Sequence, residues 1–162
     1  KRGVNNGYSE MNPEKLQCMV QLIVSKEKNG VPKTKLNKEM YYADFYSYKK
    51  YGRSISGLSY RAIQYGPVPE HYETVYDHVQ GLIKKSIETS ADFEYDLLFC
   101  DSPDTSALSK EDISVINHVM SVLVDMKRAD VVDLSHKENG WINNKDHHNI
   151  IPYDEAYSLK AF

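Results

Sequence analysis

The segment Tyr65-Gly66-Pro67-Val68-Pro69 limits the possible folds of this chain more than any other stretch. Pro67 and Pro69 hold φ at about −65° and donate no backbone hydrogen bond, so a strand that reaches this segment must end by Gly66. A residue before proline is confined to extended backbone, and glycine adds regions that other residues avoid. The segment therefore predicts a rigid corner, after which Pro69 is well placed to start a helix.

The residues before the corner predict one helix and one strand. Leu36 and Met40 recur on one helical face, with Thr34 as the expected N-cap and Gly52 as the terminator. Tyrosine and phenylalanine widen this face, and aromatic rings at helical spacing favour a role in the core. Residues 58–65 then alternate between two faces, which is typical of a half-buried strand.

Periodic patterns elsewhere predict four more helices and two more strands. The helices are expected at 13–29 with Asn12 as N-cap, at 69–83, at 110–124 behind a capping box of Ser109 and Asp112, and at 128–137 before Gly140. The strands at 86–90 and 93–100 flank a polar turn at 90–92 and are expected to pair with strand 58–65. The sequence thus predicts an α+β fold, a mainly α-helical core of about five helices with a small antiparallel sheet of about three strands.

Charge and composition bound the class of protein. The 20 basic and 23 acidic side chains give a net charge of −3, without the positive bias of most nucleic-acid binders. No apolar run approaches the ~20 residues of a membrane span, and no leader opens the chain, so we expect a cytoplasmic protein with no membrane partner. Cys18 and Cys100 lack CxxC spacing and are expected to be buried core thiols.

Three groups of residues resemble the motifs of one known family. They are Leu36-Asn37-Lys38-Glu39-Met40-Tyr41-Tyr42-Ala43 with Tyr51-Gly52-Arg53, the corner Tyr65-Gly66-Pro67-Val68-Pro69, and Leu134-Ser135-His136 with Trp141. From about residue 12 onward, the chain resembles the antitoxin SocA-like family, also called the Panacea domain. Gly140 stands before Trp141 where the family often has proline, and His136 lies earlier than the usual histidine.

The resemblance implies a function and a set of contact residues. It implies that residues 12–162 form an antitoxin domain of a bacterial or phage toxin-antitoxin system, which binds and neutralises a protein toxin and in some members acts as an adaptor to a protease. Side chains such as tyrosine and tryptophan dominate many protein interfaces. The matching motifs and the corner supply the candidate partner-binding residues Tyr41, Tyr42, Tyr65, Gly66, Pro67 and Trp141.

The first eleven residues are polar and without periodicity. We interpret residues 1–11 as a linker remnant of a longer chain. In the family that the chain resembles, the domain often follows an N-terminal DNA-binding or zinc-binding module. Any DNA binding by the full-length protein is therefore expected through such a module before it is expected through this domain.

Two other function classes stay open. The first two helices, joined by a short turn and followed by strands, could form a helix-turn-helix in a DNA-binding regulatory domain. Its basic patch would consist of Lys33, Lys35, Lys38, Lys49, Lys50 and Arg53. An uncharacterised enzyme is the third class, although the chain has no nucleophile elbow, P-loop, dinucleotide fingerprint or H-E-x-x-H motif, so we expect no catalytic residues and no cofactor.

The histidines do not predict a metal site. His136, His147 and His148 lie near carboxylates, but adjacent loop histidines rarely converge on one ion, so we expect solvated side chains and no metal. His71 and His78 are expected two turns apart on one helix, about 10.5 Å along the axis, which is too far for shared ligation.

Overall fold

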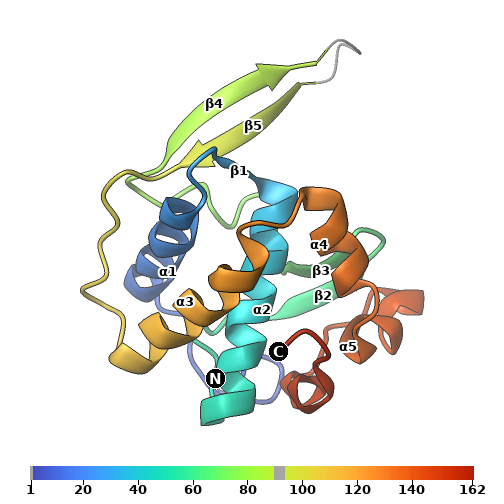
Figure 1. The fold of residues 1–162 in the computed structure, drawn as a ribbon. Coiled ribbons are helices and arrows are strands. Elements are labelled where there is room, and N and C mark those ends of the chain that lie inside the picture. Colours follow the sequence, from blue (N-terminus) through green and yellow to red (C-terminus); the bar gives the residue numbers. More distant parts are fainter. Residues whose placement is uncertain (1, 90–93) are drawn as a thin grey trace.

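The computed structural model describes residues 2–89 and 94–162, with helix α2 (Lys33–Tyr51) running through the middle of the molecule (Figure 1). Helices α1 (Pro13–Lys26), α3 (Lys110–Leu123) and α4 (Arg128–Ser135) pack against it. Most residues of α2 are buried, including polar ones, because other elements surround it on all sides. A helix in this position is the centre of the core and not a surface element.

Local signals set most ends of the longer helices as predicted, with two exceptions. Helix α1, predicted to extend to residue 29, ends at Lys26 with Glu27 as its C-cap. The Asn12 Oδ1 accepts hydrogen bonds from the backbone N–H groups of Glu14 (3.0 Å) and Lys15 (3.2 Å) at the start of α1. Ser109 and Asp112 form the expected capping box before α3. The predicted Thr34 cap of α2 is wrong: Pro32 is the N-cap, because strand β1 (Val31–Pro32) leads straight into the helix.

The α+β prediction is confirmed, but the strands form two sheets instead of one. Strand β2 (Tyr60–Ile63) pairs with β3 (Gly66–Pro69), while β4 (Ile83–Glu88) and β5 (Glu94–Phe99) join β1 in the order β1-β5-β4; all of these pairings are antiparallel. The predicted pairing of the later hairpin with strand 58–65 is therefore wrong. The turn expected at 90–92 and the first residue of the strand expected at 93–100 lie outside the described residues.

The corner itself is a strand. The expectation that pairing ends by Gly66 is wrong, because Ala62 faces Pro67 and Tyr60 faces Pro69 in the β2–β3 ladder. Within its sheet, β3 pairs with β2 alone, and an edge strand tolerates proline because its outer N–H groups need no partner in the ladder. The segment is thus one arm of a short hairpin whose turn lies at Gln64 and Tyr65.

The helix predicted at 69–83 does not form. Pro69 belongs to β3, His71 adopts a left-handed φ of 59°, Gly81 has a φ of 78°, and residue 83 enters β4. Residues 70–78 follow successive turns instead and 79–82 are irregular; this segment buries Tyr76 and leaves His71 and His78 exposed. The two histidines therefore do not share a helix face.

Three short helices follow α4; the last of them packs against α2, and the first packs against the last. These are α5 (Asn139–Ile142), the 3₁₀ helix η1 (Lys145–His147) and the 3₁₀ helix η2 (Tyr153–Ser158). The helix predicted at 128–137 ends at Ser135, and Gly140 lies inside α5 and does not terminate a helix.

Residues 2–11, interpreted above as a linker, are docked on the domain. The backbone N–H of Tyr153 donates to the Val4 carbonyl (2.9 Å), and that of Ser54 donates to the Gly7 carbonyl (2.9 Å). The ring of Tyr8 stacks on Tyr48 with the centroids 6.4 Å apart. The segment therefore contributes to the folded unit described here.

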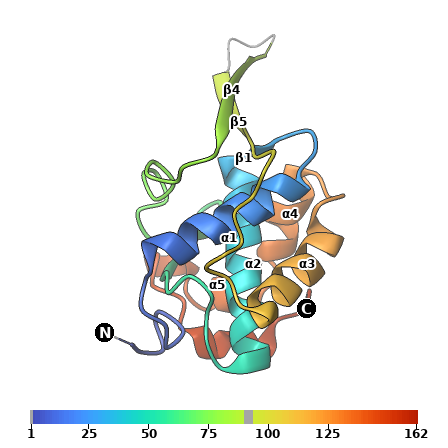
Figure 2. The ribbon, with the colours of Figure 1, turned by 90° about the vertical axis from the view of Figure 1, so that its left-hand side faces the viewer.

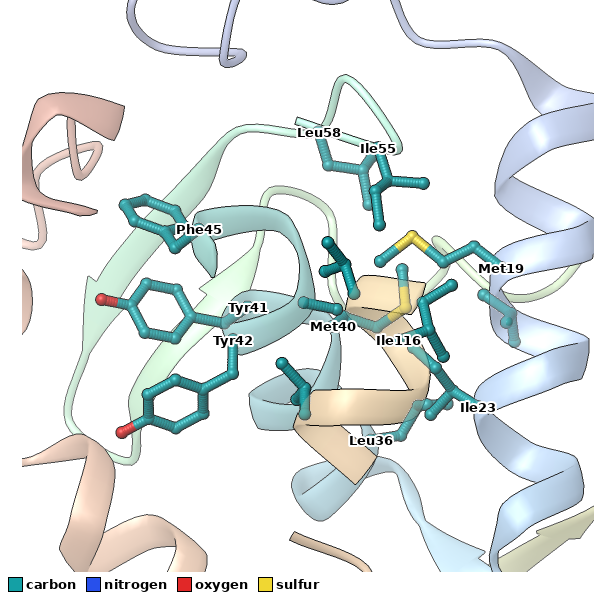
Figure 3. Packing of buried hydrophobic residues seen from close by; sticks show 14 of the residues in the cluster. Met19, Ile23, Leu36, Met40, Tyr41, Tyr42, Phe45, Ile55, Leu58 and Ile116 are labelled. Carbon is teal, nitrogen blue, oxygen red and sulfur yellow. The ribbon is translucent and has the colours of Figure 1, made fainter. Parts of the chain in front are cut away.

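The core has an aliphatic side and an aromatic side of α2 (Figure 3). Leu36 and Met40 face Met19 and Ile23 of α1, whereas Tyr41, Tyr42 and Phe45 project from the opposite side. Phe45 stacks on Tyr153, with the ring centroids 4.1 Å apart and 15° between the planes. Burying such rings contributes much of the stability of a small core.

Cys18 and Cys100 are free and buried, as predicted. Strands β4 and β5 project from the helical body as a two-stranded ribbon, which the view turned by 90° also shows (Figure 2). Within residues 2–89 and 94–162, none of the helices combines the length and the hydropathy that crossing a bilayer requires.

Candidate functional site

A cavity of about 690 Å³ lies between the first half of α2, the β2–β3 hairpin and α4. Apolar side chains and exposed polar side chains both contribute to its wall. It is lined by Lys33, Thr34, Asn37, Lys38, Ile63, Tyr65, Val68, Tyr72, Glu73, Arg128, Ala129, Val132 and Asp133. Its volume is in the range of pockets that hold a small ligand or a few side chains of a partner.

The corner forms one side of this cavity and is rigid. Gly66 has a φ of +107°, a region that other residues rarely adopt. A β-carbon at this position would lie 2.5 Å from the Lys38 Cε and 2.7 Å from the Ser135 Oγ. Backbone conformation and crowding therefore both require glycine here.

Tyr65 stands at the exposed tip of the hairpin. Its side chain is 61% exposed, although the strands on either side are paired and Gly66, Pro67 and Val68 are buried. An aromatic ring in solvent on a fixed backbone offers contact area that loses little conformational entropy on binding.

Lys38 is a buried charged group that none of the described residues pairs with. Its side chain is fully buried, and its Nζ has no hydrogen-bond or ion-pair partner in the described part of the chain. Burial lowers the pKa of Lys38 to about 8, which still leaves most of the amine protonated at neutral pH. Its neighbour Lys35 differs, because the Lys35 Nζ lies 2.8 Å from the Glu27 Oε2.

His136 and Trp141 join α4 and α5 to the hairpin. Their rings stack with the centroids 4.1 Å apart, and the Trp141 Nε1–H donates to the Ile63 carbonyl at 2.7 Å. Burial lowers the pKa of His136, and the positive charge of Lys38 lowers it further, while Asp133 acts in the opposite direction. The Nε2 of His136 is buried without a hydrogen-bond partner among the described residues.

Comparison with models of known protein families assigns this chain to a family. The model of the antitoxin SocA-like, Panacea domain family matches residues 36–142, from the first half of α2 to the end of α5. The chain belongs to this family. No curated protein and no solved structure matches it. The matched span of the Panacea domain includes every residue that lines the cavity after Thr34.

The structure separates the six candidate contact residues into two groups. Tyr65, Gly66 and Pro67 form the corner beside the cavity, and Trp141 is half-buried behind it. Tyr41 and Tyr42 are fully buried in the aromatic core, where the Tyr42 hydroxyl donates to the Glu138 Oε2 at 2.9 Å. The shared motif of the Panacea domain therefore carries core residues as well as surface ones, and these two tyrosines do not reach the surface.

Of the residues that line the cavity, the sequence singled out Tyr65 alone as a contact. Tyr72 fell within the helix predicted at 69–83, Arg128 at the start of the helix predicted at 128–137, and Lys38 in the basic patch considered for DNA. The sequence offers no signal for the burial of Lys38, because lysine is rarely buried without a partner and α2 also carries exposed lysines such as Lys49 and Lys50.

The basic patch proposed for DNA does not exist as one surface. Lys35 and Lys38 are buried, and Lys49, Lys50 and Arg53 lie at the far end of α2 from Lys33. A buried central helix also cannot enter a DNA groove. The DNA-binding alternative for the Panacea domain thus loses the surface on which it depended.

The loop histidines do not converge on a metal. Among the described residues, there is no group of three or more His, Cys, Asp and Glu side chains arranged to hold an ion. His147 and His148 are exposed in and after η1.

Proposed function

We propose that this protein is the antitoxin of a bacterial or phage toxin-antitoxin system and that it neutralises a protein toxin by direct binding. Membership of the antitoxin SocA-like, Panacea domain family supports this function. The proposed activity requires a contact surface and no catalytic group. We place it in the cytoplasm, and delivery of the bound toxin to a protease would be a further step.

The binding surface that we propose is the rim of the cavity. Tyr65, Tyr72 and Arg128 belong to it, and these are residue types that dominate interface hot spots. The rim also combines Lys33 with Glu73 and Asp133, so its charges can fix the orientation of a partner. The single observation that carries this choice is the exposed ring of Tyr65 on the rigid corner.

Co-expression with the toxin tests the proposal. Each small reading frame next to the gene is expressed alone and together with this protein, and growth is measured. We expect one of them to be toxic alone and harmless in combination. If every neighbouring frame is harmless, or stays toxic in combination, the proposed function is contradicted.

A matched pair of tyrosine variants then locates the surface. Tyr157 is 64% exposed and lies in η2, away from the cavity, so Tyr157→Ala controls for Tyr65→Ala at 61% exposure. We expect Tyr65→Ala to weaken toxin binding by about 30-fold, or about 2 kcal/mol, and Tyr157→Ala to leave it unchanged. Tyr65→Ala should keep the Tm of the parent, and Tyr157→Ala should lower it slightly, because the Tyr157 ring packs on Tyr48 with the centroids 5.8 Å apart. Equal affinities for the two variants would show that the toxin binds elsewhere.

A further inference from the structure

The cavity wall contains a positive charge that the described residues do not neutralise. Lys38 lines the cavity, yet its Nζ is out of contact with water and lacks a hydrogen-bond or ion-pair partner in the described ranges. An uncompensated buried ammonium is costly, and removing the charge by deprotonation is the usual alternative to a partner. Burial lowers the pKa of Lys38 only to about 8, so the charged form still predominates at neutral pH.

The residues around Lys38 keep its ammonium group buried and unpaired. Its Cε packs under Gly66, in the space that any larger residue would occupy. Asp133 and Glu73 line the same cavity but form no ion pair with Lys38, and both are exposed. The lysine is thus held next to an open cavity while nearby carboxylates leave it unpaired.

The rest of the wall indicates what kind of group can enter. Ile63, Val68 and Val132 are apolar, Tyr65 and Tyr72 add aromatic rings, and Lys33 and Arg128 add two positive charges. A carboxylate on an apolar body matches this combination, because the body fills the apolar part and the charge pairs with the ammonium. The flexible stem of a lysine allows the ammonium to turn toward a bound anion.

We propose that this cavity receives a carboxylate group of the protein partner, carried next to apolar atoms, and that Lys38 is the cation that pairs with it. The inference rests on the proposed function, and it adds the chemistry of the contact. Lys38 is accordingly a binding residue whose unpaired charge is completed by the partner.

The first test needs no toxin. 3-Phenylpropionate and its neutral analogue 3-phenylpropionamide are titrated into the full chain by calorimetry, and the site is located by NMR shifts of Tyr65, Gly66 and Ala129. We expect the acid to bind with a Kd of about 1 mM or lower. The amide should bind at least about tenfold more weakly than the acid. Equal binding of both probes, or no binding of either, would overturn the carboxylate site.

Lys38→Met is the decisive variant, and Lys50→Met, on the exposed end of the same helix, is its control. Replacing a buried unpaired charge by an apolar side chain of similar length should not lower the Tm, so loss of binding cannot be ascribed to unfolding. We expect Lys38→Met to lose the preference for the acid and to bind the toxin about tenfold more weakly, and Lys50→Met to behave as the parent. A Lys38→Met protein that keeps the preference or binds the toxin fully would refute the inference.

The two proposals can fail separately. If the parent neutralises a toxin but does not distinguish acid from amide, the antitoxin function stands and the carboxylate inference is wrong. If the parent selects the acid but neutralises no neighbouring toxin, the carboxylate site stands and the antitoxin function is wrong.

Discussion

The side chain of Lys38 occupies the space that a β-carbon on Gly66 would need, with the Lys38 Cε 2.5 Å from that position. One residue belongs to the central helix and the other to an edge strand, so the smallest side chain and a long one are matched across the interface of α2 and β3. The glycine of the corner and the buried lysine are therefore parts of one arrangement.

Gly66→Ala should destabilise the protein more than Gly52→Ala. Both glycines have positive φ, +107° and +75°, but a β-carbon at Gly52 meets nothing within 4 Å, whereas at Gly66 it meets Lys38 and Ser135. We expect a loss of about 1 kcal/mol for Gly52→Ala and about 2–4 kcal/mol for Gly66→Ala, measured by urea unfolding. Equal losses would show that Lys38 moves aside without cost.

The charge on Lys38 should be visible in the titration of His136. Lys38→Met removes a positive charge that lowers the pKa of His136, so this pKa should rise toward its ordinary value. The fluorescence of Trp141, the only tryptophan, can report this because its ring stacks on His136. Lys50→Met is the control, and an unchanged midpoint in Lys38→Met would contradict the expected coupling.

His136 should also make stability depend on pH. Its folded pKa lies below the ordinary value of 6.5, so the unfolded chain binds more protons in the interval between the two values. The contribution of His136 to the free energy of unfolding is therefore complete above about pH 6.5 and is lost as the pH falls through that interval. Unfolding curves of the parent and of His136→Phe, compared across this range, should diverge; parallel pH profiles would exclude His136 as the cause.

Asp44→Ala should be among the most destabilising single changes. This buried carboxylate accepts hydrogen bonds from the backbone N–H groups of Ile55 (2.8 Å) and Ser56 (2.9 Å) and from the hydroxyls of Ser56 and Tyr60. Leaving these donors unpaired should cost about 3–5 kcal/mol in denaturant unfolding, against about 1 kcal/mol for Tyr60→Phe, which removes one donor. Asp77→Ala, at an exposed aspartate, is the control. If Asp44→Ala lowers the free energy of unfolding no more than Asp77→Ala does, the expectation is contradicted.

The isolated domain should not bind random duplex DNA at about 0.15 M salt, because two of the six basic residues proposed for contact are buried. Fluorescence anisotropy of a labelled duplex, titrated at several salt concentrations, measures this directly. Tight binding that weakens steeply with salt would restore the DNA-binding alternative.

The sequence predicted those parts of the fold whose signals are local. Helix ends were predictable because a cap residue interacts with backbone groups only a few positions away. The caps are Asn12 for α1, Ser109 with Asp112 for α3, and Gly52 for α2. Residues 70–82 were misinterpreted because consecutive turns can bury apolar residues at the same spacing as a helix, and the left-handed φ of His71 leaves no trace in the residue type.

In the candidate site, too, features set by local residues were predictable and features set by distant parts of the chain were not. The unusual backbone of Gly66 was predictable, because a glycine before proline can adopt a positive φ that other residues rarely adopt. The burial of Lys38 was not, because it results from β3 and α4, which reach α2 from much later in the chain. Strand β3 was missed because two prolines argue against a strand inside a sheet. They are compatible with an edge strand, and the sequence alone does not show that β3 is one.

The pairing of β1 with β5 has a consequence for the order of folding. Val31 faces Leu98 although the two are far apart in the chain, whereas β4 and β5 are neighbours in sequence and can pair by themselves. Closing a long loop costs more conformational entropy than forming a local hairpin, so it is slower. We expect the ribbon to form early and its attachment at Val31 to come late, so that Leu98→Ala chiefly speeds unfolding in stopped-flow measurements, with little change in the refolding rate.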